Sequence, residues 1–224
     1  MRVGIVAEGR GDLAALVNVL KGALDLDFED IQFIRPEYDL DETDIHNQTE
    51  VQRGGWVRVK RECQEGVRIR EFVANVIDDE FLVVVQIDTA EAHEKGYDVV
   101  RPPRKDPEYA VQLRERVVDR ITGWLSDSGG VHVRYAVAVE EIDAWILTIF
   151  SNKDTTSHGD PKTKLKSELI KAKSAAKLKH LLHLKEYGRV DELTRPFRSR
   201  RELERCARRN SSLQAFLASL PTAL

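Results

Sequence analysis

Five carboxylates follow apolar runs of the chain at short distance, and their spacing could support metal chemistry. They are Glu8 after the first run, Asp88 after the third, and Glu140, Glu141 and Asp143 after the fourth. Carboxylates brought together repel one another unless a cation neutralises them, and oxygen ligands with few histidines suit Mg²⁺ or Mn²⁺. Mg²⁺ held by few carboxylates keeps water ligands and commonly engages phosphate oxygens. The set therefore indicates a metal ion, with Glu8 placed to bind it or to transfer a proton beside it.

Short buried strands must position these carboxylates. The runs expected to form them are Val3–Ala7, Ile31–Ile34, Phe81–Ile87 and Val131–Val139. Helical patterns lie between the runs, at Leu13–Leu24, Val57–Ile77 and Tyr109–Leu125. Alternation of strands and helices predicts an α/β fold, a Rossmann-like and mainly parallel sheet flanked by helices. The carboxyl ends of parallel strands share one edge of the sheet, where ligands bind.

The sheet core is expected to contain alternating residues of the first, third and fourth runs: Val3, Ile5, Val83, Val85, Val137 and Val139. The run "FLVVVQI" is nearly continuous and rich in β-branched residues, which is typical of a parallel strand covered on both faces. We therefore expect helices on both faces of the sheet.

The charge of the chain divides near residue 160. Residues 161–224 hold 16 Lys and Arg against 6 Asp and Glu, whereas residues 1–160 hold 19 against 32, and the net charge of the whole is −3. We predict an α/β domain over 1–160 and a basic helical extension over 161–224 that packs on it. The basic region suits either a polyanion such as nucleic acid or the acidic body of the protein itself.

Several classes of protein are disfavoured. No apolar run approaches the roughly 18–20 residues of a membrane span and no signal-peptide pattern precedes Glu8, so we expect a cytoplasmic protein with no membrane contact. Cys63 and Cys206 belong to no CxxC pair, which argues against a zinc site or a disulfide framework. Neither GxxxxGK[ST] nor GxGxxG occurs, which argues against an NTPase or a dinucleotide enzyme.

Four short motifs, taken in order, resemble one protein family. "VAEGRGD" after a strand, with an aspartate after a later hydrophobic strand, is similar to the Toprim domain of type IA and type II topoisomerases, primases and OLD-type nucleases. The resemblance is closer to a bacterial family of Toprim-like proteins of unknown function, the RloG type. It spans nearly the whole chain and rests on the "EGRGD" start, "RGGW" at 53–56, "IDAWIL" at 142–147 and "SSLQAFLASL" at 211–220.

The resemblance implies a Toprim fold and Mg²⁺-dependent cleavage of phosphodiester bonds in nucleic acid. It implies that Glu8 and Asp88 are catalytic carboxylates, with Glu8 as general acid, general base or metal ligand. Further metal ligands would come from Glu91 or from the group of Glu140, Glu141 and Asp143. Related proteins often occur with an ATPase, so the resemblance also implies an ATPase partner in trans and a role in bacterial defence.

One position departs from the Toprim pattern. Where those enzymes carry Asp-x-Asp, this chain has Asp88-Thr89-Ala90. A Toprim-like module that binds nucleic acid or a protein without cleaving it therefore stays open. A small-molecule phosphotransfer or hydrolytic enzyme using the same metal site is a third hypothesis.

Four basic residues are candidate contacts to nucleic acid: Arg10, Arg101, Arg104 and Lys105. Arg10 lies in the glycine turn and suits either a phosphate or pairing with Asp12, and the other three lie in the loop "RPPRK". Trp145 is expected in the core rather than as a platform for base stacking. His180 and His183 are expected on a solvated helix face rather than as a metal pair.

Overall fold

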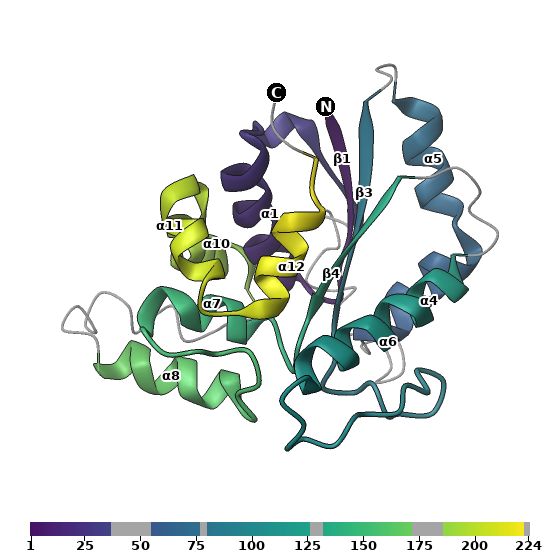
Figure 1. Ribbon diagram of the computed structural model, residues 1–224. Helices are drawn as coiled ribbons and strands as arrows, with labels where there is room; N and C mark the ends of the chain where they lie inside the picture. The colour runs from purple at the N-terminus through teal and green to yellow at the C-terminus, as the bar shows by residue number, and fades with distance from the viewer. Residues whose placement is uncertain (37–54, 77–79, 126–131, 172–185, 222–224) are drawn as a thin grey trace.

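The central layer of the molecule is a four-stranded sheet in which all neighbouring strands are parallel (Figure 1). The computed structural model describes residues 1–36, 55–76, 80–125, 132–171 and 186–221. The strands follow the order β2-β1-β3-β4, with the bounds β1 (Arg2–Val6), β2 (Ile31–Arg35), β3 (Phe81–Asp88) and β4 (Val133–Ala138). The predicted α/β class is confirmed, and each of the four predicted runs forms a strand.

Helices connect the strands and cover both faces of the sheet (Figure 1). They are α1 (Arg10–Leu24), α4 (Gly55–Glu65), α5 (Val67–Asn75), α6 (Tyr109–Trp124), α7 (Asp143–Phe150), α8 (Pro161–Lys171), α10 (Tyr187–Thr194), α11 (Arg200–Ala207) and α12 (Ser211–Ser219), with 3₁₀ turns η1 (Phe28–Asp30) and η3 (Arg195–Arg198). Within the ranges described above, no helix is long and apolar enough to cross a membrane.

The helix expected over 57–77 is divided into α4 and α5. Gly66 lies between them in a left-handed conformation, with φ of 58°, which glycine adopts at little cost. The buried Glu62 carboxylate accepts hydrogen bonds from the amides of Arg68 and Ile69, at 3.0 and 3.1 Å. These bonds satisfy donors in the first turn of α5, so a single glycine and a single carboxylate account for the break.

Alternate strand residues pack on opposite faces of the sheet. Val83, Val85 and Val137 pack on the face covered by α4, α5 and α6. Val3 and Ile5 pack on the other face, against α1 and the C-terminal helices. The six residues predicted for the sheet core, Val139 included, are all buried, and the expected two-faced cover is confirmed.

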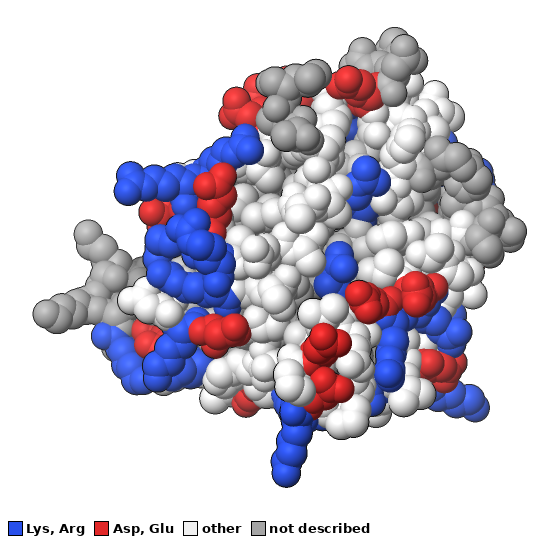
Figure 2. Space-filling view, viewed as in Figure 1, with Lys and Arg blue, Asp and Glu red and all other residues white. Residues whose placement is uncertain are grey.

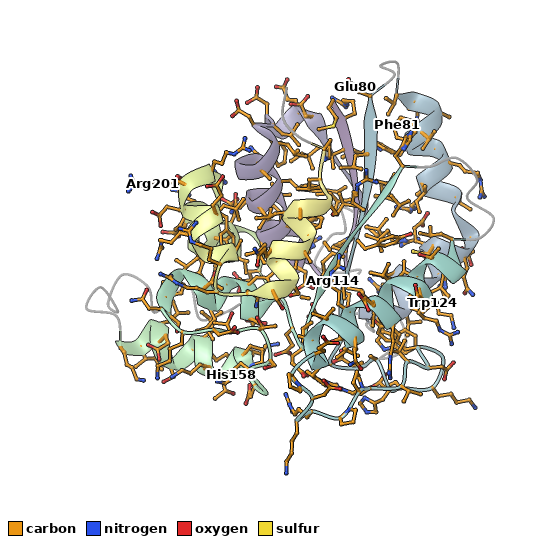
Figure 3. The ribbon with its side chains drawn as sticks, viewed as in Figure 1. Glu80, Phe81, Arg114, Trp124, His158 and Arg201 are labelled. Carbon is orange, nitrogen blue, oxygen red and sulfur yellow. The ribbon has the colours of Figure 1, made fainter. Side chains whose placement is uncertain are left out.

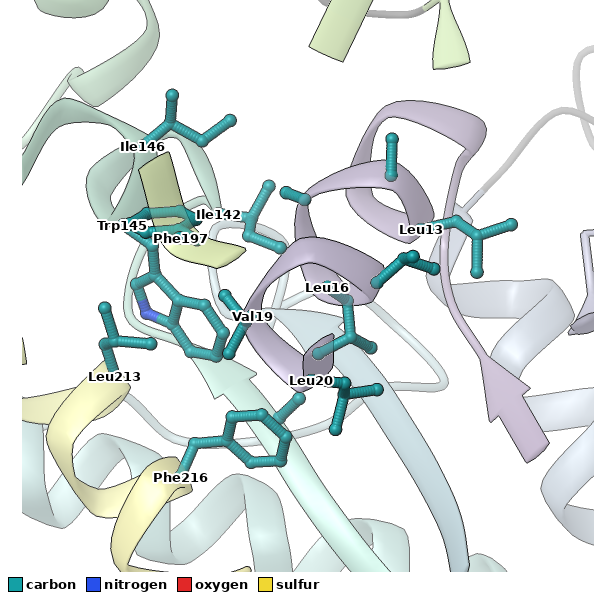
Figure 4. Packing of buried hydrophobic residues seen from close by; sticks show 14 of the residues in the cluster. Leu13, Leu16, Val19, Leu20, Ile142, Trp145, Ile146, Phe197, Leu213 and Phe216 are labelled. Atoms are coloured by element: carbon teal, nitrogen blue, oxygen red, sulfur yellow. The ribbon is translucent and has the colours of Figure 1, made fainter. Parts of the chain in front are cut away.

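The described helices after residue 161 bury their apolar side chains in the same cluster as α1. Figure 4 shows Trp145 of α7 and Phe216 of α12 beside the face of α1 that carries Leu16, Val19 and Leu20. The Trp145 and Phe216 rings stack with centroids 5.8 Å apart, and the Trp145 indole donates a 2.8 Å hydrogen bond to Ser212. Trp145 is therefore a core residue, as expected, and the motifs "IDAWIL" and "SSLQAFLASL" meet inside the protein.

Candidate functional site

Glu8 and Asp88 are in contact at the carboxyl edge of the sheet. β1 and β3 are adjacent and parallel, so the residues that end them emerge side by side. The Asp88 amide donates a 2.7 Å hydrogen bond to Glu8 Oε1. Gln86 joins the same two residues, because it donates to Asp88 Oδ1 at 2.9 Å and accepts from the Glu8 amide at 3.0 Å. The structure thus brings together the two carboxylates that the sequence singled out for catalysis.

Asp143 and Glu141 reach the same edge from β4. The chain leaves β4 at Ala138 and enters α7 at Asp143, and on the way the Ile142 amide donates a 3.1 Å hydrogen bond to Asp88 Oδ1. Asp143 is only 7% exposed, and its buried Oδ1 atom has no hydrogen-bond partner among the residues that the structure describes. A buried acceptor left unpaired costs free energy that a ligand could recover.

Asp12 belongs to the same group, although from the sequence it was expected only to pair with Arg10. It lies in the first turn of α1, which begins directly after Gly9, and the Gly9 amide hydrogen-bonds its carboxylate. Asp12 raises the pKa of both Glu8 and Asp88 by repulsion, so the three carboxylates face one another. The available signal was an aspartate four residues after the glutamate that ends a strand, within the same glycine turn.

We call this group the carboxylate cluster: Glu8, Asp12, Asp88, Glu91, Glu141 and Asp143. Burial, followed by repulsion from Asp12, raises the pKa of Glu8 and of Asp88 well above the ordinary range. Burial also raises the pKa of Asp143 to about 7 and that of Asp12 to about 6, although Lys162 opposes both shifts. At neutral pH the cluster must therefore hold protons, a cation or both.

Lys162 supplies a positive charge to the cluster from the first turn of α8. Its Nζ atom lies 3.8 Å from Glu141 Oε1. Burial alone would lower its pKa, but Asp143, Glu141, Asp12 and Asp88 together raise it. From the sequence, the basic segment 161–224 suited either a polyanion or the acidic body of the protein, and nothing in it distinguished Lys162 from the other lysines.

Glu140 is not part of the carboxylate cluster, and its predicted role as a metal ligand is corrected here. Arg101 and Arg104 donate to its carboxylate at 2.6 and 3.0 Å, and the Tyr109 hydroxyl donates at 2.8 Å. Arg101 also donates to the Ala90 carbonyl at 2.9 Å, so the ion pair fixes the loop after β3. The carboxylate is already neutralised, which leaves it no need of a metal.

The same ion pairs change the interpretation of the predicted nucleic-acid contacts. The Arg101 side chain is 24% exposed and committed to Glu140, whereas that of Arg104 is 54% exposed. Lys105 is exposed, and Arg10 is half-buried at the start of α1. Of the four, Arg104 and Lys105 therefore offer the most accessible charge.

The remaining candidates from the sequence are Glu91, the two cysteines and two histidines. Glu91 is half-buried in the turn after β3, and burial raises its pKa. Cys63 and Cys206 are buried free thiols. His180 and His183 lie outside the described residues.

Gly55, from the "RGGW" motif, brings the start of α4 against Glu8. A Cβ atom added at Gly55 would lie 2.4 Å from Glu8 Oε2 and 2.9 Å from Glu8 Cβ. Trp56 next to it donates to Glu94 at 3.0 Å and packs on Tyr97, whose hydroxyl donates to the Asp88 carbonyl at 3.0 Å. The described part of the motif, Gly55 and Trp56, therefore lies beside Glu8 and Asp88 on the α4 side.

The carboxylate cluster suits a cation, although its side chains do not supply a complete set of ligands. Among the residues with described positions, no group of three or more His, Cys, Asp or Glu side chains could hold a metal ion. Mg²⁺, however, is commonly held by only one or two carboxylates together with water and substrate phosphate. The unpaired Oδ1 atom of Asp143 is a ready acceptor for such an ion. The donor set therefore suits a hard cation that keeps part of its hydration shell.

A cavity of about 980 Å³ lies at the opposite, amino edge of the sheet, with Lys21, Phe81 and Arg134 among its lining residues. It is remote in the fold from Glu8, two residues past the end of β1, and from Asp88 at the end of β3, so it is not part of the carboxylate cluster.

Comparison of the chain with protein-family models, with curated proteins and with solved structures found no match.

Proposed function

We propose that the protein is a Mg²⁺- or Mn²⁺-dependent enzyme of Toprim type that cleaves phosphodiester bonds in nucleic acid. The observation that carries the proposal is the buried, unpartnered Oδ1 atom of Asp143 in a group of mutually repelling carboxylates. That atom lies at the same sheet edge as the Glu8–Asp88 contact. The ordered motifs that resemble the Toprim-like family support the same function.

Asp88 and Asp143 are the residues that would hold the ion, since two carboxylates completed by water and substrate phosphate suffice for Mg²⁺. When bound, the ion would polarise the scissile phosphate. Glu8 suits proton transfer beside it, because burial raises the pKa of its carboxyl group, which favours the protonated form, and the side chain keeps partial exposure. The carboxylates therefore divide between binding the ion and moving a proton.

A basic surface over α8 and α11 suits the backbone of the substrate. Figure 2 shows blue side chains gathered at the left of the molecule, where Figure 1 places these two helices. Arg200, Arg201 and Arg208 are exposed there, and Figure 3 shows Arg201 extending outward from α11. Ion pairs such as Arg205–Glu202, at 2.6 Å, neutralise part of the surface. Contacts of this kind bind phosphates with little sequence preference and weaken as salt rises.

The test is cleavage of single- and double-stranded DNA and RNA by the full-length protein, with and without Mg²⁺ or Mn²⁺. Glu8→Gln and Asp88→Asn should each lower metal-dependent cleavage by about 100-fold or more, the range expected for a lost acid–base group. Both variants should stay folded, with a melting temperature no lower than that of the wild type, because each removes a carboxylate whose pKa is raised in the folded protein. Glu71→Gln changes an exposed carboxylate on α5 and should leave cleavage unchanged. Cleavage that persists in both site variants would overturn the proposal.

A binding module without cleavage is the second candidate, favoured by Ala90 at the position of the second Toprim aspartate. It predicts salt-sensitive binding of nucleic acid and no divalent-dependent cleavage of any polymer. Nucleotides tested in the same assay address the third hypothesis, since hydrolysis of nucleotides alone would indicate a small-molecule enzyme.

A further inference from the structure

Gln86 is a buried polar residue in the apolar run of β3. It belongs to the sequence "FLVVVQI", and its side chain is fully buried. Val84 and Asp88 share its face of the sheet, because the side chains of a strand alternate between faces. A buried amide costs free energy unless its polar atoms find hydrogen-bond partners. An apolar residue would pack here without that requirement, so the role of Gln86 lies in the bonds that its amide makes.

The backbone of Glu8 fixes which way the Gln86 amide points. A backbone N–H group can only donate, so the atom of Gln86 that lies 3.0 Å from the Glu8 amide nitrogen is the oxygen Oε1. The nitrogen Nε2 is thereby turned to Asp88 Oδ1, at 2.9 Å. Gln86 therefore presents a donor to Asp88 in one fixed orientation, and the same side chain links the residue after β1 to the end of β3.

These bonds commit one oxygen of the Asp88 carboxylate. Oδ1 accepts from Gln86 and also from the Ile142 amide, at 3.1 Å. None of the described residues donates a hydrogen bond to Oδ2 of Asp88. Asp88 keeps partial exposure, so Oδ2 is the oxygen that a ligand can reach. Glu8 is held in turn by a bond that does not involve Gln86, because its Oε1 accepts from the Asp88 amide at 2.7 Å.

We propose that Gln86 is a positioning residue for the carboxylate cluster: its amide fixes Glu8 against Asp88 and leaves Oδ2 of Asp88 for a divalent ion. The part that concerns the ion rests on the proposed function, whereas the fixing of Glu8 against Asp88 follows from the hydrogen bonds alone. Gln86 acts through these two carboxylates and does not itself bind the ion. Replacing a residue that orients a metal ligand commonly lowers metal affinity or activity by about 10- to 100-fold.

The part that concerns the ion is tested by the Mn²⁺ dependence of nucleic-acid cleavage by full-length wild type and Gln86→Met. Methionine is close to glutamine in size and lacks both polar atoms of the amide, so it suits the buried position. Gln86→Met should need about 10- to 100-fold more Mn²⁺ for half-maximal cleavage. A mere loss of folded protein would lower the maximal rate and leave this midpoint unchanged. Gln86→Asn, whose amide is one methylene too short to reach both partners, should shift the midpoint in the same direction.

Asn18→Leu is the matched control, because it removes another fully buried amide. The Asn18 amide donates to the Asp191 carbonyl at 2.9 Å and to the Thr194 hydroxyl at 2.7 Å, where α1 packs against α10. None of these bonds reaches the carboxylate cluster. Asn18→Leu should therefore keep the Mn²⁺ midpoint of the wild type, even where it melts at a lower temperature.

Amide hydrogen exchange in EDTA tests the fixing of Glu8 against Asp88 without any metal. In Gln86→Met the Glu8 and Asp88 amides should exchange about tenfold faster than in wild type, or more, as expected for a lost hydrogen bond. The Asp88 amide decides the question, because Gln86 does not contact it and its acceptor is the Glu8 carboxylate. The Ala7 and Thr89 amides, which donate to carbonyls of neighbouring strands, should keep their wild-type rates.

The two measurements separate this inference from the proposed function. A wild type that cleaves nothing at any Mn²⁺ concentration would remove the proposed function, and faster exchange of the Asp88 amide in Gln86→Met would still support the positioning role. Unchanged exchange of the Asp88 amide would overturn the inference, whether or not the wild type cleaves. An Mn²⁺ midpoint that Gln86→Met shares with an active wild type would overturn it as well, and would leave the proposed function standing.

Discussion

Asp143 and Glu140 lie three residues apart, and their side chains have opposite surroundings. Glu140 is held by two arginines and a tyrosine, whereas Asp143 is equally buried with an oxygen that has no partner. A satisfied carboxylate of the first kind contributes to the structure. A buried carboxylate of the second kind, with a strongly raised pKa, is typical of a functional site.

The metal-free protein should lose stability as the pH rises from 5 to 8. The pKa of folded Asp143 is about 7 and that of Asp12 about 6, both above the value near 3.9 of an unfolded aspartate. The folded state therefore binds more protons over this interval, so the free energy of unfolding falls with rising pH and levels off above the folded pKa values. Urea unfolding in EDTA at several pH values measures this slope.

Asp143→Asn should flatten the slope and raise stability at pH 8 by on the order of 1–3 kcal/mol, since each pKa unit corresponds to about 1.4 kcal/mol. Asp119→Asn, at an exposed carboxylate of α6, is the control and should keep the slope of the wild type. A wild-type stability that climbs between pH 5 and 8 would contradict the assignment of these groups.

At the scale of elements, the strands and the sheet edge that they share could be predicted from the sequence. The periodicity and apolar composition of a segment follow directly from how it is buried. Glu8 and Asp88 were found for this reason, since Glu8 follows such a strand by two residues and Asp88 ends one. The roles within "EEID" could not be predicted, because they depend on a backbone with φ of 64° at Glu140 and on arginines about 40 residues away. The position of Lys162 beside the carboxylate cluster could not be predicted either, because it depends on the packing of α8 against α7.

The loop after β3 should depend on the Glu140 ion pairs. Glu140→Gln leaves the Arg101 charge, on a side chain only 24% exposed, without its counter-charge, and breaking such a largely buried pair costs about 3–5 kcal/mol. Asp98→Asn is the matched control, because the Arg120–Asp98 pair in the same region is exposed and such pairs contribute about 1 kcal/mol or less. Urea unfolding should separate the two variants, and limited proteolysis should cut the loop faster in Glu140→Gln. Equal losses of unfolding free energy in both variants would show that the Glu140 ion pairs do not hold the loop after β3 in place.

At the scale of the whole molecule, the basic C-terminal helices and the acidic sheet edge belong to one packed structure. α10, η3, α11 and α12 supply buried side chains to the cluster that covers α1. Arg209 donates to the Thr148 and Ser151 carbonyls at the end of α7, each at 3.1 Å, and Asn210 donates to Thr155 at 3.0 Å. The segment that carries the basic surface therefore also fixes the helix that begins at Asp143.

Phe216→Ala tests this coupling between the C-terminus and the site. Phe216 is fully buried and stacks on Trp145, two residues after Asp143. Its truncation should lower the free energy of unfolding by about 3–5 kcal/mol, as for other buried phenylalanines. Because Trp145 would lose its packing partner, α7 should also become less well fixed, and Mn²⁺ binding should weaken in the variant even where it remains folded.

Ile170→Ala, at a side chain 60% exposed on α8, is the control. It should change the free energy of unfolding by about 0.5 kcal/mol or less and leave Mn²⁺ binding intact. If Phe216→Ala lost stability but bound Mn²⁺ as the wild type does, the C-terminal helices would stabilise the fold without positioning the carboxylate cluster.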